Sequence, residues 1–163
     1  FQQALLRANY RPSALLAIDG TVGLELRESG DSSEFNPIFG LGITWRPRLG
    51  TAVALAAESR IFNSASVENT NYRSTSVSLR VSQRIGYRLT ASAALGYEIA
   101  EYESLGGGRS GSRRDELLGG SLELSLPITQ RWSWALTLSA SENISNERPF
   151  ELYQVVLQTT YSF

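Results

Sequence analysis

Apolar and polar residues alternate along most of this chain. Between Phe39 and Arg46, for example, Phe, Leu, Ile and Trp occupy every second position, with Gly, Thr or Arg between them. Successive side chains of a β-strand point to opposite faces, so this period of two predicts a strand with one apolar face. The pattern recurs in about eight segments, which cover residues 16–27, 36–46, 53–61, 75–82, 89–99, 118–126, 132–140 and 153–163.

The connections between these segments alternate in length. Short turns are expected near residues 47–50, 84–87 and 127–131, and longer polar loops near 28–36, 62–72, 102–114 and 143–149. Strands of about nine to eleven residues are long enough to cross a bilayer on a tilt, and short turns at one end with long loops at the other are typical of outer-membrane barrels. The expected fold is all-β: an antiparallel up-and-down transmembrane β-barrel of about eight strands over residues 14–163, or the C-terminal strands of a larger barrel.

The N-terminal segment, residues 1–13, has two interpretations. Leu6, Ala8 and Tyr10 alternate as in an extra strand. The run from Gln2 to Arg7 is also rich in residues that favour a short helix. Single-chain bacterial barrels have even strand numbers, so an extra strand would imply further strands before the given sequence.

The two faces of the predicted strands differ in chemistry. One face is built of Leu, Val, Ile and aromatic residues, whereas the other combines Gly, Ala, Ser and Thr with charged residues. The charged residues are Asp19, Glu25, Arg27, Arg46, Glu58, Arg60, Arg80, Glu98 and Glu123. A barrel of about eight strands is narrow inside, so we expect the apolar face to contact lipid and the charged face to line the lumen as a network of Glu–Arg pairs. A soluble, lipocalin-like barrel that binds a small apolar ligand inside is the alternative.

Aromatic residues gather next to the short turns. They are Trp45, Trp132, Trp134, Tyr161 and Phe163. We expect them to form an aromatic girdle at one membrane interface. The last strand also ends on Tyr161 and Phe163, and in this it resembles the C-terminal strand of bacterial outer-membrane barrels. That resemblance implies that Tyr161 and Phe163 act as a sorting signal for the barrel-insertion machinery.

Composition excludes most catalytic and binding chemistry. Cys, His, Met and Lys are absent, so there is no disulfide and no zinc site of the usual kinds, and we expect no metal and no cofactor. A net charge of -1 argues against a nucleic-acid surface. No apolar run is long enough for a transmembrane helix. Two close carboxylates could do acid–base chemistry, but ion pairs with Arg are the favoured interpretation of the inward Glu residues, so no catalytic residue is expected.

Short sequence motifs around the turns show a second resemblance. Tyr10-Arg11-Pro12 and Trp45-Arg46-Pro47 precede Leu-rich alternation, and a later strand contains Gly96-Tyr97-Glu98. In these features the chain resembles the β-barrel porins of exopolysaccharide-exporting Gram-negative lineages. The resemblance implies a place in the cell outer membrane and a porin-like or anchoring role. It also implies contact with outer-membrane lipid and lipopolysaccharide, and it leaves open an oligomer or a complex with other envelope proteins.

A further hypothesis concerns the binding of lipopolysaccharide phosphates by arginine side chains. Arg109, Arg113 and Arg114 fall in a predicted loop, where guanidinium groups could pair with phosphate oxygens in a bidentate way. A simply solvated loop remains the alternative.

Overall fold

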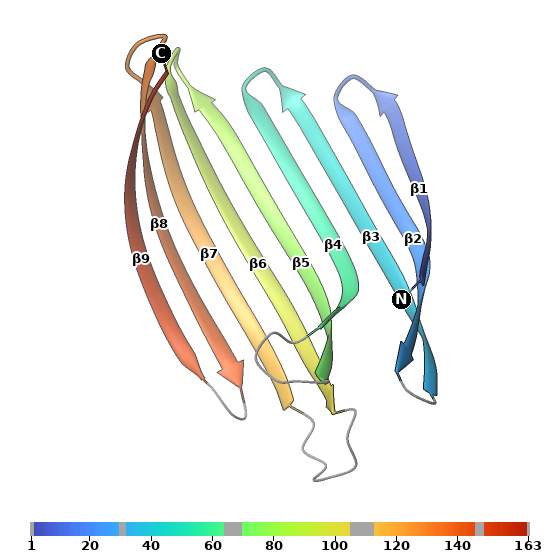
Figure 1. Ribbon diagram of the computed structural model, residues 1–163. Helices are drawn as coiled ribbons and strands as arrows, with labels where there is room; N and C mark the ends of the chain where they lie inside the picture. Colours follow the sequence, from blue (N-terminus) through green and yellow to red (C-terminus); the bar gives the residue numbers. More distant parts are fainter. Residues whose placement is uncertain (1, 30–31, 64–69, 105–112, 146–148, 163) are drawn as a thin grey trace.

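The computed structural model describes residues 2–29, 32–63, 70–104, 113–145 and 149–162, and these residues form one antiparallel sheet of nine strands (Figure 1). The strands are β1 (Gln2–Ser13), β2 (Leu16–Ser29), β3 (Ser32–Arg48), β4 (Thr51–Asn63), β5 (Thr70–Ile85), β6 (Leu89–Ser104), β7 (Arg113–Pro127), β8 (Trp132–Ser145) and β9 (Phe150–Tyr161). Each strand pairs with its neighbour in sequence, which confirms the predicted up-and-down order. Among the described residues there is no helix long and apolar enough to cross a membrane.

The number of strands differs from the prediction of about eight. Of the two interpretations of the N-terminal segment, the structure has the strand: β1 pairs with β2 from Gln2 opposite Leu26 to Ser13 opposite Leu16. A register shift between Tyr10 and Ser13 accommodates the turn that follows.

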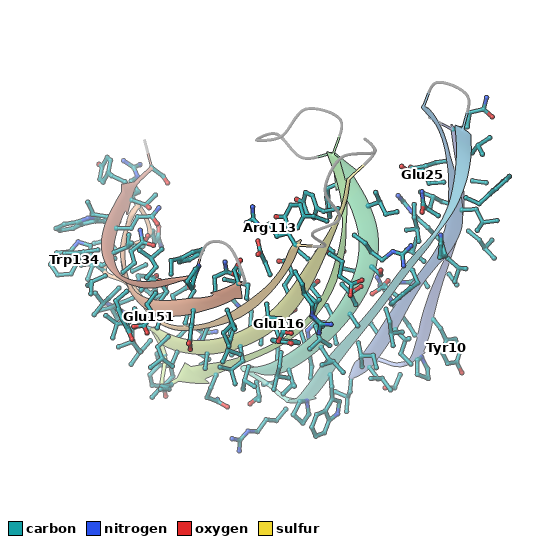
Figure 2. The ribbon with its side chains drawn as sticks, turned by 90° about the horizontal axis from the view of Figure 1, so that it is seen from below. Tyr10, Glu25, Arg113, Glu116, Trp134 and Glu151 are labelled. Carbon is teal, nitrogen blue, oxygen red and sulfur yellow. The ribbon has the colours of Figure 1, made fainter. Side chains whose placement is uncertain are left out.

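The sheet is curved but open. Within the described part of the chain, β1 pairs only with β2 and β9 only with β8, and the sheet forms a trough with separate edges (Figure 2). Eight strands are enough to close a small barrel whose interior is filled by side chains. Nine strands that leave their edges apart therefore have the curvature of a wider barrel.

The strands are longer than the apolar alternation suggests. They run from 12 to 17 residues, and they take in positions predicted as loop, such as Tyr72 in β5 and Tyr102 in β6. The prediction was wrong at these ends because backbone hydrogen bonding does not require an apolar face. The ladder between β5 and β6 continues to Thr70 opposite Ser104, well past the last apolar position.

The three short turns fall where the sequence predicts them, and glycines shape two of them. Gly50 has φ 81° and Gly86 has φ 63°, a region that side chains with a Cβ rarely adopt. Neighbouring hairpins are also joined near their turns, because the Arg84 amide donates to the Gly50 carbonyl at 2.6 Å and the Arg46 amide donates to the Leu15 carbonyl at 2.7 Å. The turn end of the sheet is thus one connected rim.

The apolar residues do not form an interior core. Leu79 lies directly between Leu55 and Leu95 on neighbouring strands, yet all three side chains are at least 40% exposed. Among the described residues, the only buried hydrophobic side chains are Ile38 and Ala100. A sheet whose large apolar side chains are exposed in this way needs a nonpolar surrounding to be stable.

The two faces of the trough match the two faces predicted from the sequence. Tyr10 and Trp134 project from the convex side, and Glu25 and Arg113 from the concave side (Figure 2). Residues directly opposite one another share a face, so the pairing registers extend this assignment across the sheet. The convex face carries the row that runs from Tyr10 through Ile18, Ile43, Leu55 and Leu79 to Leu95.

Candidate functional site

The middle of the concave face is lined by very small side chains. One row of directly opposed residues crosses β3 to β8, and it consists of Gly42, Ala56, Ser78, Gly96, Gly119 and Ser141. Such residues protrude little from the backbone. The concave wall therefore leaves the space in front of it open at this height instead of filling it.

On the turn side of this band, one ion pair spans a strand. Arg80 of β5 approaches Glu123 of β7, with Nη2 and Oε2 3.3 Å apart. Between them lies β6, which presents only Ser92 and Ala94 at these heights, since Arg80 is opposite Ala94 and Glu123 is opposite Ser92. Small residues on β6 therefore let the longer side chains meet across it. Both charged side chains stay well exposed, at 54% and 37%.

On the loop side, three of the predicted carboxylates contact residues of the same or a neighbouring strand. Glu58 pairs with Arg60 of the same strand at 3.5 Å. Glu98 accepts a hydrogen bond from Ser74 Oγ at 2.6 Å. Glu25, only 2% exposed, accepts one from the Gln3 amide.

The remaining predicted lumen residues differ in what they contact. Asp19 accepts a hydrogen bond from the Asn9 amide, a neutral donor on the neighbouring strand. Arg46 lies at the turn end, far along the strand from the carboxylates of the loop end, and makes no ion pair within the described residues. The side chain of Arg27 falls outside the described part. The sequence places these residues on one face, but only the cross-strand registers decide which of them meet.

The loop end of the concave face carries a cluster that the sequence analysis missed. Phe62, Tyr72 and Tyr102 stack across β4, β5 and β6, with ring centroids 5.5 and 5.0 Å apart. The Arg113 guanidinium lies 4.6 Å from the Tyr102 ring centroid, and its Nη2 donates to Asp115 at 2.5 Å. The apolar alternation ends before these aromatic residues, so the sequence predicts loops there and indicates no shared face for them. The cluster braces the loop end of the wall.

Two of the arginines considered for lipopolysaccharide, Arg113 and Arg114, lie on opposite faces of β7. Arg113 is on the concave face in the cluster just described. Arg114 follows it on the opposite face, where it pairs with Glu116 at 2.9 Å and with Glu101 at 3.8 Å. Arg109 lies outside the described residues. A shared phosphate site formed by Arg113 and Arg114 is therefore excluded by their orientation.

The turn end of the convex face carries the predicted aromatic residues. Trp45, Trp132, Trp134 and Tyr161 all lie on this face next to the turns, and each is at least 39% exposed. Trp132 and Trp134 meet edge to face with centroids 5.6 Å apart, and Trp132 Nε1 donates to Thr159 Oγ1 at 2.7 Å. Phe163 lies outside the described residues.

Tyr97 lies near the opposite limit of the apolar face, one convex position before Ile99 on β6. Its hydroxyl donates to Glu116 Oε2 at 2.6 Å, and Glu116 and Arg114 begin a charged zone beyond it. An aromatic ring on the apolar side with its hydroxyl in a charged zone is the arrangement expected at a membrane–water interface. The apolar face is thus bounded by aromatic residues at both ends.

The apolar hollows of the wall face outward. A hollow of about 650 Å³ lies over β6 to β9 and one of about 360 Å³ over β5 to β8, where Gly120, Ala91 and Ala93 leave gaps between the larger convex side chains. Those larger side chains include Leu95, Leu122, Leu138 and Tyr153. Both of these hollows lie on the convex side of the sheet, outside the trough.

Glu58 and Glu98 lie in one row of the concave face, with Ser76 between them. Each carboxylate has a different partner, since Glu58 pairs with Arg60 and Glu98 accepts a hydrogen bond from Ser74. Within the described part of the chain, no group of three or more possible metal ligands comes together.

Comparison with known families agrees with this geometry. The family model described as putative beta-barrel porin 2 matches residues 21–161, which is most of the chain. Searches of curated proteins and of solved structures found no match. A meander with a small-residue and charged concave face and an apolar convex face is what a porin wall requires. This chain belongs to the putative β-barrel porin 2 family.

Proposed function

We propose that this chain forms part of the wall of a β-barrel in the bacterial outer membrane and that small polar solutes pass along its concave face. The observation that carries the proposal is the band of Gly, Ala and Ser across the middle of that face, in a sheet too shallowly curved to close as a small barrel. Small inward side chains and a wide radius leave room for water. The chain has no catalytic role in this proposal.

The convex face supports the location in a membrane. Large apolar side chains cover it between an aromatic zone at the turn end and the Tyr97–Glu116 contact at the loop end. By analogy with other outer-membrane barrels, the short turns face the periplasm. The aromatic zone at the turns then acts as the girdle of the inner leaflet.

Conductance in a planar lipid bilayer tests the proposal. The closed barrel that contains this chain in its wall, folded into lipid, should give stable current steps in potassium chloride. Replacing the mid-band Gly96 by Trp should reduce the step size, because a large side chain would project into the open space. Leu95→Trp is the matched control, because its side chain lies on the convex face and should leave the conductance unchanged. Absence of any current from correctly folded protein would contradict the pore.

A soluble ligand-binding barrel is the competing function, and detergent dependence separates the two. A chain that spans a membrane should aggregate when detergent is removed, whereas a lipocalin-like protein should remain monodisperse. Size-exclusion chromatography before and after detergent removal gives the answer. The outward position of the large apolar side chains favours aggregation.

A further inference from the structure

The charged side chains at the turn end of the sheet, taken over its four hairpins, are all positive. The segments that form it, residues 10–17, 44–53, 82–91 and 126–134, contain no Asp or Glu. They contain six arginines: Arg11, Arg46, Arg48, Arg84, Arg88 and Arg131. None of the six is joined to a carboxylate by an ion pair within the described residues. Like charges held close together repel one another, and a bound anion would relieve that repulsion.

Two of these arginines line a cleft. It has a volume of about 420 Å³, lies between the β1–β2 and β3–β4 turns, and its lining includes Arg46, Arg48 and Ser82 together with Leu15 and Leu49. The backbone fixes one wall of it, because the Arg46 amide donates to the Leu15 carbonyl. We call this space the turn-end cleft.

The arginines of the cleft retain unused hydrogen-bond donors. A guanidinium carries five N–H donors and no acceptor. Arg48 donates hydrogen bonds to Thr51 Oγ1 at 3.0 Å and to Gln83 Oε1 at 3.5 Å, and these hold its side chain in place. Arg46 makes no side-chain hydrogen bond within the described residues. Together they offer several free donors in one small space.

We propose that the turn-end cleft binds a phosphate-type oxyanion and that Arg46 and Arg48 hold it. Planar guanidinium forks match the oxygens of phosphate in spacing and charge. The phosphate group could belong to a free solute at the mouth of the trough or to the headgroup of an anionic phospholipid. The guanidinium groups would bind its oxygens in the same way in both cases. The role of the site in solute passage rests on the proposed pore, but the binding itself does not.

Titration of the folded full chain with inorganic phosphate at low ionic strength tests the binding. We expect saturable heat of binding, and a loss of affinity of about tenfold or more in the double variant R46Q/R48Q, because charge-assisted hydrogen bonds are removed. The matched control is Arg88→Gln. Arg88 has the same charge at the same end but lies outside the cleft lining, with its guanidinium on the Ile128 carbonyl at 3.2 Å. It should bind phosphate as the unaltered chain does.

Two results would overturn the cleft site. One is no saturable binding by the unaltered chain. The other is an equal loss in R88Q, which would mean that the rim attracts anions only through its overall charge. If the double variant fails to fold, the single variant R46Q keeps the test open, because this side chain makes no hydrogen bond or ion pair within the described residues.

Lipid nanodiscs identify the source of the anion. If a headgroup is bound, native mass spectrometry should find phosphatidylglycerol retained over phosphatidylcholine by the unaltered chain and by R88Q, but not by R46Q/R48Q. Phosphate binding without such retention would assign the site to a free solute. A folded chain that binds phosphate but gives no conductance would contradict the pore and leave the site intact.

Discussion

An arginine in the centre of the convex face should strongly destabilise the protein in lipid. Leu79 lies opposite Leu55 and Leu95, and on β6 the apolar face runs from Leu89 to Ile99. Ten residue steps at about 3.3 Å, on strands tilted by about 40°, span about 25 Å, which is the height of the apolar band of an outer-membrane barrel. The position of Leu95, next to Leu79, is close to the middle of that span.

The expected cost follows from this depth. An arginine on the lipid face of a barrel costs about 2–4 kcal/mol at the bilayer midplane. Leu79→Arg should therefore lower the folding equilibrium constant by about 30- to 700-fold, since each 1.4 kcal/mol is a factor of ten. In water the same change would cost little, because the side chain is already 40% exposed.

The measurement is urea unfolding in lipid vesicles, followed by tryptophan fluorescence and by the heat-dependent shift in gel mobility. The matched control is Ser78→Arg, one residue away on the concave face between Ala56 and Gly96. It should cost less than about 1 kcal/mol, because that side chain would face water. Equal costs for the two variants would refute the assignment of the convex face to lipid.

Three further predictions concern single contacts. In urea unfolding, Gly50→Ala should cost about 1 kcal/mol more folding free energy than Gly86→Ala. Both positions have positive φ, but only at Gly50 would a Cβ meet Arg84 Cβ, at 2.9 Å. Equal costs for the two variants would contradict this contact. Glu123→Gln should change the free energy of unfolding by less than about 1 kcal/mol, because the ion pair with Arg80 is exposed. In a bilayer under a salt gradient, Glu123→Gln should shift the reversal potential toward anion selectivity, and Arg80→Gln should shift it toward cation selectivity. No shift in either variant would place the pair outside the conduction path. Trp132→Phe should lower the free energy of unfolding in vesicles by about 1 kcal/mol, because it removes the hydrogen bond from Trp132 Nε1 to Thr159 Oγ1. If this bond is the cause, Trp132→Phe should have no such effect in a Thr159→Val background.

The sequence alone was sufficient for the class of fold and for the chemistry of its two faces. Alternation with a period of two is a local property, and every pair of neighbouring side chains reports it independently of the rest of the chain. Gly50 and Gly86 mark turns in the same local way, because few other residues adopt a positive φ. The assignment of Glu58 and Arg80 to one face and Leu79 to the other could therefore be made without coordinates.

Only the tertiary structure decided which residues meet and how wide the wall is. The pairing of Arg80 with Glu123 depends on two successive registers and on small residues in the strand between them, and neither can be read from one segment. The Phe62–Tyr72–Tyr102 stack has the same origin, because hydrogen bonding between strands extends past the apolar alternation. The curvature that keeps β1 and β9 apart is set by the twist and stagger of the whole sheet. It is a collective property, and no local pattern encodes it.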